Sequence, residues 1–339
     1  MSERYSRQVL FPSIGEAGQQ KISQKHVLII GAGALGSGNA ETLARAGIGR
    51  LTIVDRDYVE ASNLQRQQLY TEADAAEKLP KAVAAEKRLR AINSEVSIRS
   101  IIGDATPEML EELIAGVDLI LDSTDNFETR MALNDISQKY NIPWIYGACV
   151  SSFGMSFSIL PGRTPCLNCL LKTVPIQGLT CDTAGIIAPA VQMVIAHQTA
   201  EALKILVEDW GAIRTSFVSF DLWRNQYTSM KMTKAKDKGC LSCGDIKTFP
   251  YLESENHTKT TVLCGRDTVQ IRPPHQQQIN LNDLAGQLQR LGYRINGNPY
   301  LISAEADEKR IVIFHDGRAL IHGTKDLSQA KTIYQRLLG

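Results

Sequence analysis

Gly31, Gly33 and Gly36 follow the apolar run "HVLII" with the spacing G-x-G-x-x-G, which is typical of a turn that binds the phosphates of a nucleotide. In such a turn the first glycine permits a tight bend, the second lets the backbone approach phosphate, and the third packs the next helix against the strand. Asp55 ends the following apolar run, "RLTIVD", where a carboxylate can accept hydrogen bonds from ribose hydroxyls. These residues predict an adenine-nucleotide site. The alternative is that the glycines serve only a close strand–helix crossing.

The polar residues further along favour ATP over NAD as that nucleotide. Asn63 and Arg66 stand three apart, which places them on one side of a short helical turn. Lys81 begins a predicted helix, and Asp125 follows the apolar run "VDLILDST". Chemistry on a phosphoryl group needs cations and a magnesium ligand, whereas hydride transfer needs a proton donor, and the six histidines are scattered. Each side chain alone fits a solvated surface charge, but together they favour a site for ATP and Mg²⁺.

Two C-x-x-C pairs form a second candidate site. Cys166 with Cys169 and Cys240 with Cys243 supply four thiols, the donor set of a closed tetrahedral zinc site. The long gap between the pairs leaves open a pair of redox-active or unligated motifs. A closed zinc site with four thiolate ligands stabilises the fold and takes no part in catalysis.

Three further cysteines have separate interpretations. Cys181 precedes a long predicted helix, whose N-terminus would stabilise a thiolate. Cys149 follows a predicted strand and is expected to be a packed core thiol. Cys264 has no visible partner and is expected to be buried and inert.

The elements that position these residues alternate between strand and helix from about 26 to 148, which predicts an α/β fold with a Rossmann-like, mostly parallel sheet. From about 149 to 248 the pattern changes to antiparallel strands around one long helix, roughly 183–208. A polar stretch at 249–261 is interpreted as a linker between an N-terminal domain, 1–248, and a small α+β C-terminal module, 262–339.

Composition limits the class of protein. The chain has 339 residues, 43% hydrophobic and 22% charged, with a net charge of +1, so bulk electrostatics give no case for a nucleic acid or membrane partner. No apolar run reaches the length of about 18 residues that a spanning helix needs. The N-terminus has no signal-peptide pattern, and seven cysteines favour a reducing cytoplasm.

The segments "GAGALGS", "VDRDYVEASNLQRQ" and "DSTDN", with the paired C-x-x-C motifs, resemble the ubiquitin-activating-enzyme-like family, and within it the bacterial adenylyltransferases of sulfur-carrier proteins. The likeness runs from about Arg4 to Asp245. It implies that MgATP and the C-terminal Gly-Gly tail of a small ubiquitin-like carrier bind, that the tail carboxylate attacks the α-phosphorus, and that pyrophosphate leaves. It also implies structural zinc on the four paired cysteines.

The resemblance assigns roles residue by residue. Asp55 is implied as the ribose ligand, Asn63, Arg66 and Lys81 as the phosphate clamp, and Asp125 as the acid that holds magnesium. Arg7, in "RYSRQ", is implied to reach the phosphates of a neighbouring subunit, which makes the expected assembly a homodimer. The whole nucleotide site implied in this way comprises Gly31, Gly33, Ala34, Gly36, Asp55, Asp57, Ser62, Asn63, Arg66, Lys81, Asp125 and Asn126.

Three questions stay open at the level of sequence. The favoured pathway is molybdopterin synthesis, with the carrier of thiamine-thiazole synthesis as the alternative. An NAD-linked oxidoreductase and a non-catalytic adaptor are more remote. By the resemblance, Cys181 corresponds to a cysteine that bonds covalently to the carrier in some relatives and is dispensable in others. A separate sulfur donor is expected, because the C-terminal module has no cysteine in a suitable loop.

Overall fold

Strands and helices of the N-terminal part alternate along the chain in the computed structural model, which describes residues 3–172, 184–253, 260–262, 267–273, 278–306 and 309–338. The strands of this part are β1 His26–Ile30, β2 Arg50–Asp55, β3 Ser97–Ile102, β4 Leu119–Asp122, β5 Trp144–Val150, β6 Phe153–Ile159, β7 Ser216–Asp221 and β8 Gln226–Lys231. Its α-helices are α1 Ser6–Val9, α2 Gly15–Ile22, α3 Ala34–Arg45, α4 Glu72–Ala76, α5 Lys81–Ile92, α6 Pro107–Leu113, α7 Phe127–Tyr140, α8 Leu167–Leu171 and α10 Ala188–Leu206. Short 3-10 turns are η1 Glu3–Tyr5, η2 Ala61–Asn63, η3 Thr233–Ala235 and η4 Pro250–Leu252.

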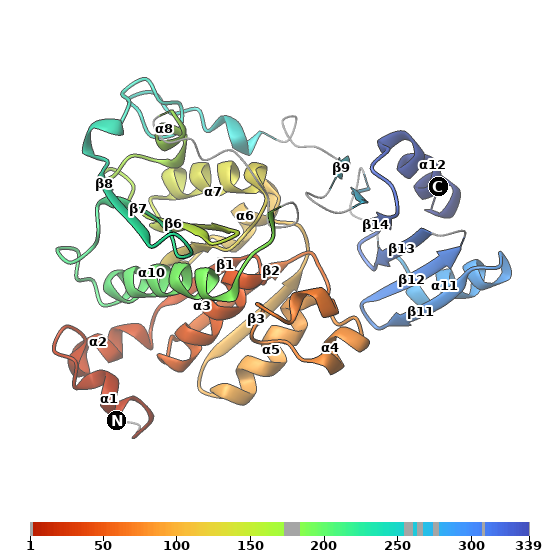
Figure 1. Cartoon of the computed structure of the whole chain (residues 1–339), viewed down its shortest axis with the longest axis horizontal. Helices are drawn as coiled ribbons and strands as arrows, with labels where there is room; N and C mark the ends of the chain where they lie inside the picture. Colours follow the sequence, from red (N-terminus) through yellow and green to blue (C-terminus); the bar gives the residue numbers. More distant parts are fainter. Residues whose placement is uncertain are drawn as a thin grey trace.

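These eight strands form one sheet in the order β3-β2-β1-β4-β5-β6-β7-β8. Neighbours are parallel from β3 to β5 and antiparallel from β5 to β8. Every residue of β1 is buried, because helices cover both faces of a parallel sheet. One apolar cluster lies under α3, α5 and α10 and another under α6 and α7, so the sheet is the middle of three layers (Figure 1).

The long helix begins later than the sequence pattern indicated. α10 starts at Ala188, with Pro189 in its first turn, whereas the predicted helix started near residue 183. Just before it, the Ile187 amide donates to the Ser151 carbonyl at 3.0 Å, and Ile186 bridges to Ser151, so these residues are extended. Proline favours the start of a helix because it lacks an amide proton, which explains the later beginning.

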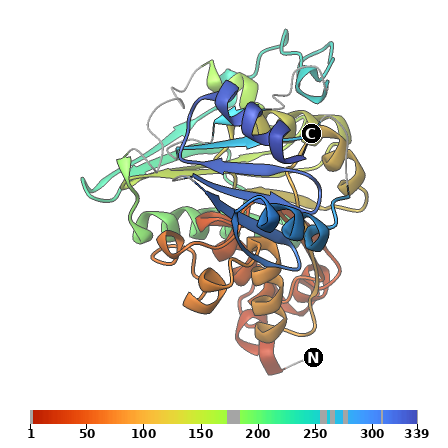
Figure 2. The same ribbon diagram turned by 90° about the vertical axis from the view of Figure 1, so that its right-hand side faces the viewer.

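The C-terminal module has a sheet of its own, as predicted. Its strands are β9 Thr260–Val262, β10 Thr268–Ile271, β11 Arg294–Asn298, β12 Leu301–Ala306, β13 Lys309–Phe314 and β14 Ala319–His322, and its helices are α11 Leu281–Arg290 and α12 Leu327–Leu338. The strands are antiparallel in the order β11-β12-β13-β14-β10-β9. Both helices pack on one face of this sheet (Figure 2).

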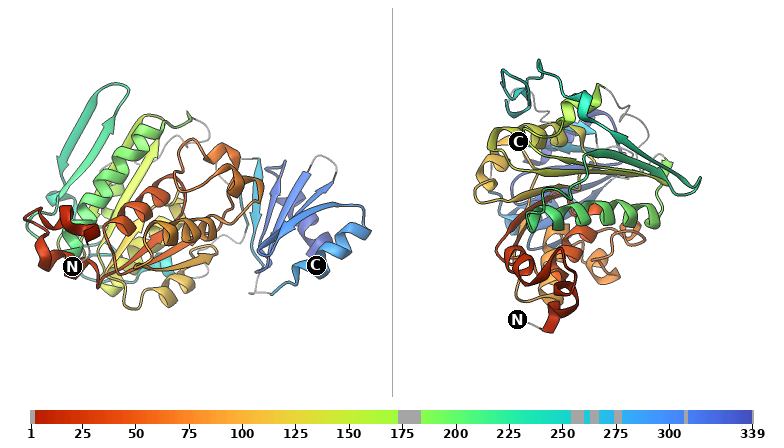
Figure 3. Two further views of the ribbon diagram at one scale, coloured as in Figure 1. Left: turned by 90° about the horizontal axis from the view of Figure 1, so that it is seen from below. Right: turned by 90° about the vertical axis from the view of Figure 1, so that its left-hand side faces the viewer.

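The module lies beside α4 and the loop after β2, at the end of the molecule away from α1 and α2 (Figure 3). Parts of the predicted linker, 249–261, are structured: η4 packs on α7, and β9 pairs with β10 from Thr260 onward. The predicted fold class is confirmed, and the exact domain limits stay predictions. Among the described residues, no helix is both long and apolar enough to cross a membrane.

Candidate nucleotide site and cysteine centre

The glycine turn lies where the strand order reverses, between β1 and β4, which is where open α/β sheets bind ligands. Gly31 has φ +94°, and a Cβ there would lie 2.5 Å from the Ser123 carbonyl oxygen. A Cβ at Gly36 would overlap the carbonyl oxygen of Gly31. Among the described residues, a Cβ at Gly33 would meet only Gln67 Nε2, at 3.9 Å, so the backbone there is open to a ligand. α3 begins at Ala34, and the amides of its first turn have no acceptor within the helix.

This geometry predicts opposite effects of two alanines. Gly36→Ala should lower the melting temperature by about 5–10 °C, because its Cβ overlaps backbone that cannot move freely. Gly33→Ala should melt near the wild-type temperature but weaken ATP binding about 10-fold, since the methyl group occupies the approach to phosphate. Thermal unfolding and calorimetric titration with ATP measure both. Equal effects of the two substitutions would contradict the assignment.

Asp55 is placed by backbone amides from two loops. Its Oδ2 accepts from the Ala32 amide at 2.6 Å, and its Oδ1 from the Asp57 amide at 2.7 Å. Burial raises the pKa of Asp55, and the nearby Lys81 ammonium opposes that rise. The carboxylate therefore lies beside the glycine turn, as a ribose ligand would.

Lys81 begins α5 directly after Pro80, as predicted. Its amide donates to the Asp57 carbonyl at 2.9 Å, and its ammonium lies 3.2 Å from Asp57 Oδ2. The Lys81 side chain is only 5% exposed. Because the Lys81 side chain is already ordered by burial and by Asp57, its ammonium can bind a phosphate with little further loss of side-chain entropy.

The turn η2 and the residues that follow it carry the rest of the predicted phosphate clamp. The Asn63 Oδ1 accepts from the Glu60 amide at 3.1 Å, while its Nδ2 is buried and has no hydrogen-bond partner among the described residues. Arg66 is half-buried, and its Nη1 donates to the carbonyl of the exposed Ser62 at 3.0 Å. A buried amide donor without a partner is costly unless a ligand accepts from it, so Asn63 points to a bound acceptor.

Asp125 is exposed: 84% of its side chain is accessible. It lies in the loop after β4, and its Oδ1 is 3.9 Å from Arg56 Nη2. The next residue, Asn126, caps α7 by accepting from the Thr129 amide at 3.2 Å. An exposed carboxylate in this loop suits a magnesium ion that is shared with a substrate.

The sequence analysis missed the residues that hold the loop of Asp125. The Arg130 Nε lies 2.9 Å from Asp122 Oδ2, at the end of β4, and its Nη2 donates to the carbonyls of Thr124 at 2.5 Å and Gly147 at 3.1 Å. Burial raises the pKa of Asp122 even though Arg130 opposes the rise. The sequence gives one signal for this pair, which is the position of Arg130 eight residues after Asp122, the acid that ends β4.

A buried amide network supports the same edge of the sheet. Gln198, in α10, donates to the carbonyls of Asp122 at 2.7 Å and Ile145 at 3.2 Å. Asn39, in α3, donates to Gln198 Oε1 at 2.8 Å and to Ser123 Oγ at 3.2 Å. The polar Gln198 in a mostly apolar helix was visible in the sequence as an interruption of a core helix, and the structure gives it this bridging role.

The structure thus gathers most of the predicted nucleotide site on consecutive loops at the carboxyl edge of the sheet. Arg7 is the exception: it is exposed on the short helix α1, which lies at the other end of the molecule from α4 (Figure 1). Cys181 and Cys264 lie outside the described residues, and α10 begins several residues after position 181. Cys149, predicted to be a packed core thiol, is half-buried and packs against the apolar cluster of α3 and α10.

The four paired cysteines form one buried centre between α8 and the segment after η3. Their sulfurs all lie within 4.8 Å of one another. Cys166 Sγ and Cys240 Sγ are 3.6 Å apart, and Cys169 Sγ and Cys243 Sγ are 3.5 Å apart. Four thiolates about 2.3 Å from a tetrahedral zinc ion would be about 3.8 Å from one another. The arrangement is therefore compatible with zinc.

Comparison with known proteins agrees with this geometry. The model of the ThiF family matches residues 5–242. Sulfur carrier protein ThiS adenylyltransferase of Bacillus subtilis (strain 168) is 52% identical over 339 residues, which cover 100% of both chains. Molybdopterin-synthase adenylyltransferase of Escherichia coli (strain K12) is 34% identical over 244 residues, 71% of this chain and 96% of that protein.

A solved structure, E. coli MccB with ATP, superposes with a TM-score of 0.62 at 24% identity, over 72% of this chain and 75% of that chain. This likeness shows a shared fold.

Proposed function

This chain belongs to the ThiF family, and from that premise we propose that it adenylylates the C-terminal glycine of a small ubiquitin-like sulfur-carrier protein with ATP. One observation carries the proposal: a relative named as a sulfur-carrier adenylyltransferase is 52% identical along the whole chain. The grouping of Asp55, Asn63, Lys81 and Asp125 around an open glycine turn supports it. The reaction prepares the carrier for thiocarboxylate formation, with a separate protein as sulfur donor.

The site suits in-line attack of a carboxylate on the α-phosphorus. A carboxylate is a weak nucleophile toward a polyanion, so neutralisation of charge and alignment supply most of the rate. The amides of the α3 N-terminus, the Asn63 amide group, Arg66 and Lys81 hold the phosphates from one side. Asp55 fixes the ribose, so that the α-phosphorus faces the incoming carrier tail.

The proposed enzyme binds two metals, at separate sites. The exposed Asp125 carboxylate would hold Mg²⁺, which would supply positive charge for the phosphates of ATP. Zinc fits the four buried sulfurs, whose spacing matches a tetrahedral thiolate set, and it stabilises the fold.

A homodimer accounts for the position of Arg7. In its own chain Arg7 is exposed on α1, and the nearby Tyr5 lies against Gly47, at the end of α3 that is away from the glycine turn, so we infer that Arg7 reaches phosphates only in a partner subunit. We also propose that the enzyme is cytoplasmic, since a reducing compartment keeps paired cysteines as thiols that can bind zinc.

We propose the carrier of thiamine-thiazole synthesis as the substrate, in place of the molybdopterin carrier that the sequence analysis favoured. The B. subtilis relative, named for ThiS, matches from end to end and so includes the C-terminal module. The molybdopterin-synthase relative covers 71% of this chain. No single residue distinguishes the two carriers, and the length of the match favours the thiamine carrier.

Purified carriers distinguish the two substrates. With ATP and Mg²⁺, carrier-dependent exchange of labelled pyrophosphate into ATP should be at least about 10-fold faster with the thiamine carrier, because a cognate surface adds binding energy that a shared tail cannot. Mass spectrometry of each carrier should show the adenylate. Faster exchange with the molybdopterin carrier would reverse the pathway. No exchange with either carrier would favour the adaptor alternative, and NAD binding at this site would favour the oxidoreductase.

A further inference from the structure

The C-terminal module buries the second face of its sheet against the nucleotide-binding part. Leu301, Val312, Phe314 and Leu320 form a buried apolar cluster with Tyr58, from the loop after β2, and this cluster excludes α11 and α12, which cover the other face. Tyr58 is 3% exposed. The module therefore packs on the segment that joins Asp55 to η2.

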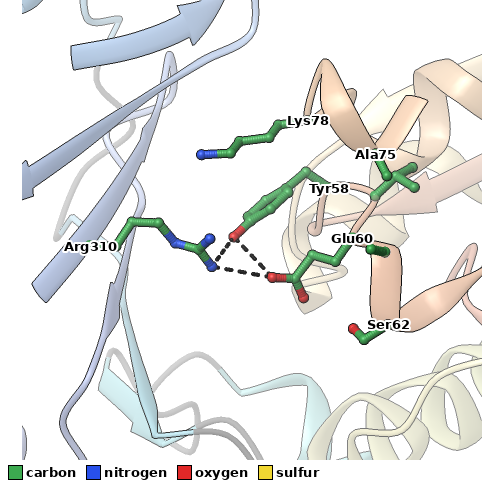
Figure 4. A pocket seen from close by; sticks show the side chains of 8 residues that line it. Tyr58, Glu60, Ser62, Ala75, Lys78 and Arg310 are labelled. Atoms are coloured by element: carbon green, nitrogen blue, oxygen red, sulfur yellow. Dashed lines mark hydrogen bonds and ion pairs between the residues drawn. The ribbon is translucent and has the colours of Figure 1, made fainter. Parts of the chain in front are cut away.

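A charged contact beside Tyr58 reaches the turn that carries Asn63. Arg310 Nη2 lies 3.2 Å from Glu60 Oε1 and donates to Tyr58 Oη at 2.9 Å, as Figure 4 shows. The Glu60 backbone is in turn bonded to Asn63 in both directions: its amide donates to Asn63 Oδ1 at 3.1 Å, and its carbonyl accepts from the Asn63 amide at 2.9 Å. The pocket beside Arg310, about 280 Å³, extends to Ser62 in the same turn.

A second charged contact reaches Asp125. Asp104, after β3, accepts from Gln270 Nε2 at 2.6 Å and pairs with Arg272 Nη2 at 2.6 Å, both from the module. The other oxygen of Asp104 lies 3.5 Å from Arg56 Nη1, and Arg56 Nη2 lies 3.9 Å from Asp125. Burial by itself would raise the pKa of Asp104, but the surrounding arginines hold it below its ordinary value, so the cluster stays charged.

In this arrangement Arg310 and Arg272 supply no group that binds the substrate directly. Arg310 acts on Asn63 through Glu60, and Arg272 acts on Asp125 through Asp104 and Arg56. A loop with hydrogen-bonded, buried anchors at both ends loses less freedom when ATP binds than an unanchored loop does.

We propose that the C-terminal module positions the nucleotide site of this enzyme, with Arg310 and Arg272 as positioning residues that hold the loops after β2 and β3 in their ATP-binding arrangement. The inference rests on the proposed function, because it takes Asn63 and Asp125 as ligands of MgATP. It gives the module a part in ATP binding that the shorter relatives must supply in another way.

The test compares full-length variants in carrier-dependent pyrophosphate exchange. R310A should raise KM for ATP about 10-fold and leave kcat within about 3-fold, since it removes binding that ground state and transition state share. R310K should recover part of the loss because it keeps the charge beside Glu60. The matched control is K325A, which removes an exposed ion pair with Asp267 in the same module and should behave as wild type.

Hydrogen exchange gives a readout that does not depend on turnover. Residues 56–66 should exchange faster in R310A than in K325A, both free and with ATP, while the remainder of the module keeps its protection. If R310A opens the whole module, R272Q takes its place, with a raised KM for ATP as the supporting result and an unchanged KM as the contradicting one.

The outcomes separate the two proposals. Wild-type exchange with equal KM values for R310A and K325A would overturn the positioning role and leave the proposed function intact. Absence of wild-type exchange with any carrier would overturn the proposed function. In that case calorimetric titration with ATP still tests the positioning role. Weaker binding of ATP by R310A than by K325A would support the role, and equal affinities would overturn it.

Discussion

Asp125→Ala should lower carrier-dependent pyrophosphate exchange about 1000-fold, because it removes the proposed magnesium ligand where negative charge develops. The Asp125 side chain is 84% exposed and lies 3.9 Å from Arg56 Nη2, at the limit of an ion pair, so little folding energy depends on it. The melting temperature should therefore stay at the wild-type value. Arg66→Ala should reduce exchange to a similar extent, since it removes a cation of the phosphate clamp.

Glu108→Ala is the matched control for this experiment. Glu108 is an exposed acid in the first turn of α6, after β3, at the same edge of the sheet. Its loss should leave exchange within about 2-fold of wild type, because a solvated surface charge contributes little. If the Asp125 variant kept more than a third of wild-type exchange, the assignment of that residue would be wrong.

Cys166→Ser should release the metal and destabilise the protein. Cys166 is fully buried among three other sulfurs, and a hydroxyl is a poor zinc ligand. Loss of a structural zinc site is worth at least about 5 kcal/mol, which corresponds to a fall of about 10–20 °C in melting temperature for a domain of this size. Metal analysis should find about one zinc per wild-type chain and almost none in the variant.

Cys149→Ser provides the comparison. Cys149 is half-buried and does not belong to the four-cysteine centre. This variant should keep its zinc and melt within a few degrees of wild type. Zinc retained at full occupancy in the Cys166 variant, or absent from the wild type, would exclude the proposed centre.

Much of the nucleotide site followed from the sequence because its residues lie next to regular elements. Gly31 and Gly36 were predicted from spacing, and the structure shows the contacts that exclude a side chain at both positions. Lys81 at the start of α5 and Asp55 at the end of β2 were predicted from local patterns of proline and apolar residues. Such signals depend on a few neighbouring residues, so they can be found without knowledge of the fold.

Contacts between distant segments were outside the reach of the same reasoning. Arg130 and Gln198 were missed as supports of the Asp125 loop, since each acts by reaching the backbone of another strand. Hydropathy patterns give the face of a helix that is buried, and they give no information about which carbonyl a buried amide will meet.

The sequence by itself determined the order of strands and helices along the chain, the nucleotide turn, and the two cysteine pairs, because hydrophobic periodicity and short spacings depend only on neighbouring residues. Only the tertiary structure decided that the cysteine pairs share one centre, that the Asn63 amide donor is buried with no partner among the described residues, and that Asp104 binds Arg272 of the C-terminal module. Each of these depends on where two surfaces meet in space. The packing of the whole chain sets the position at which two surfaces meet, and the residues on one surface do not specify that position alone.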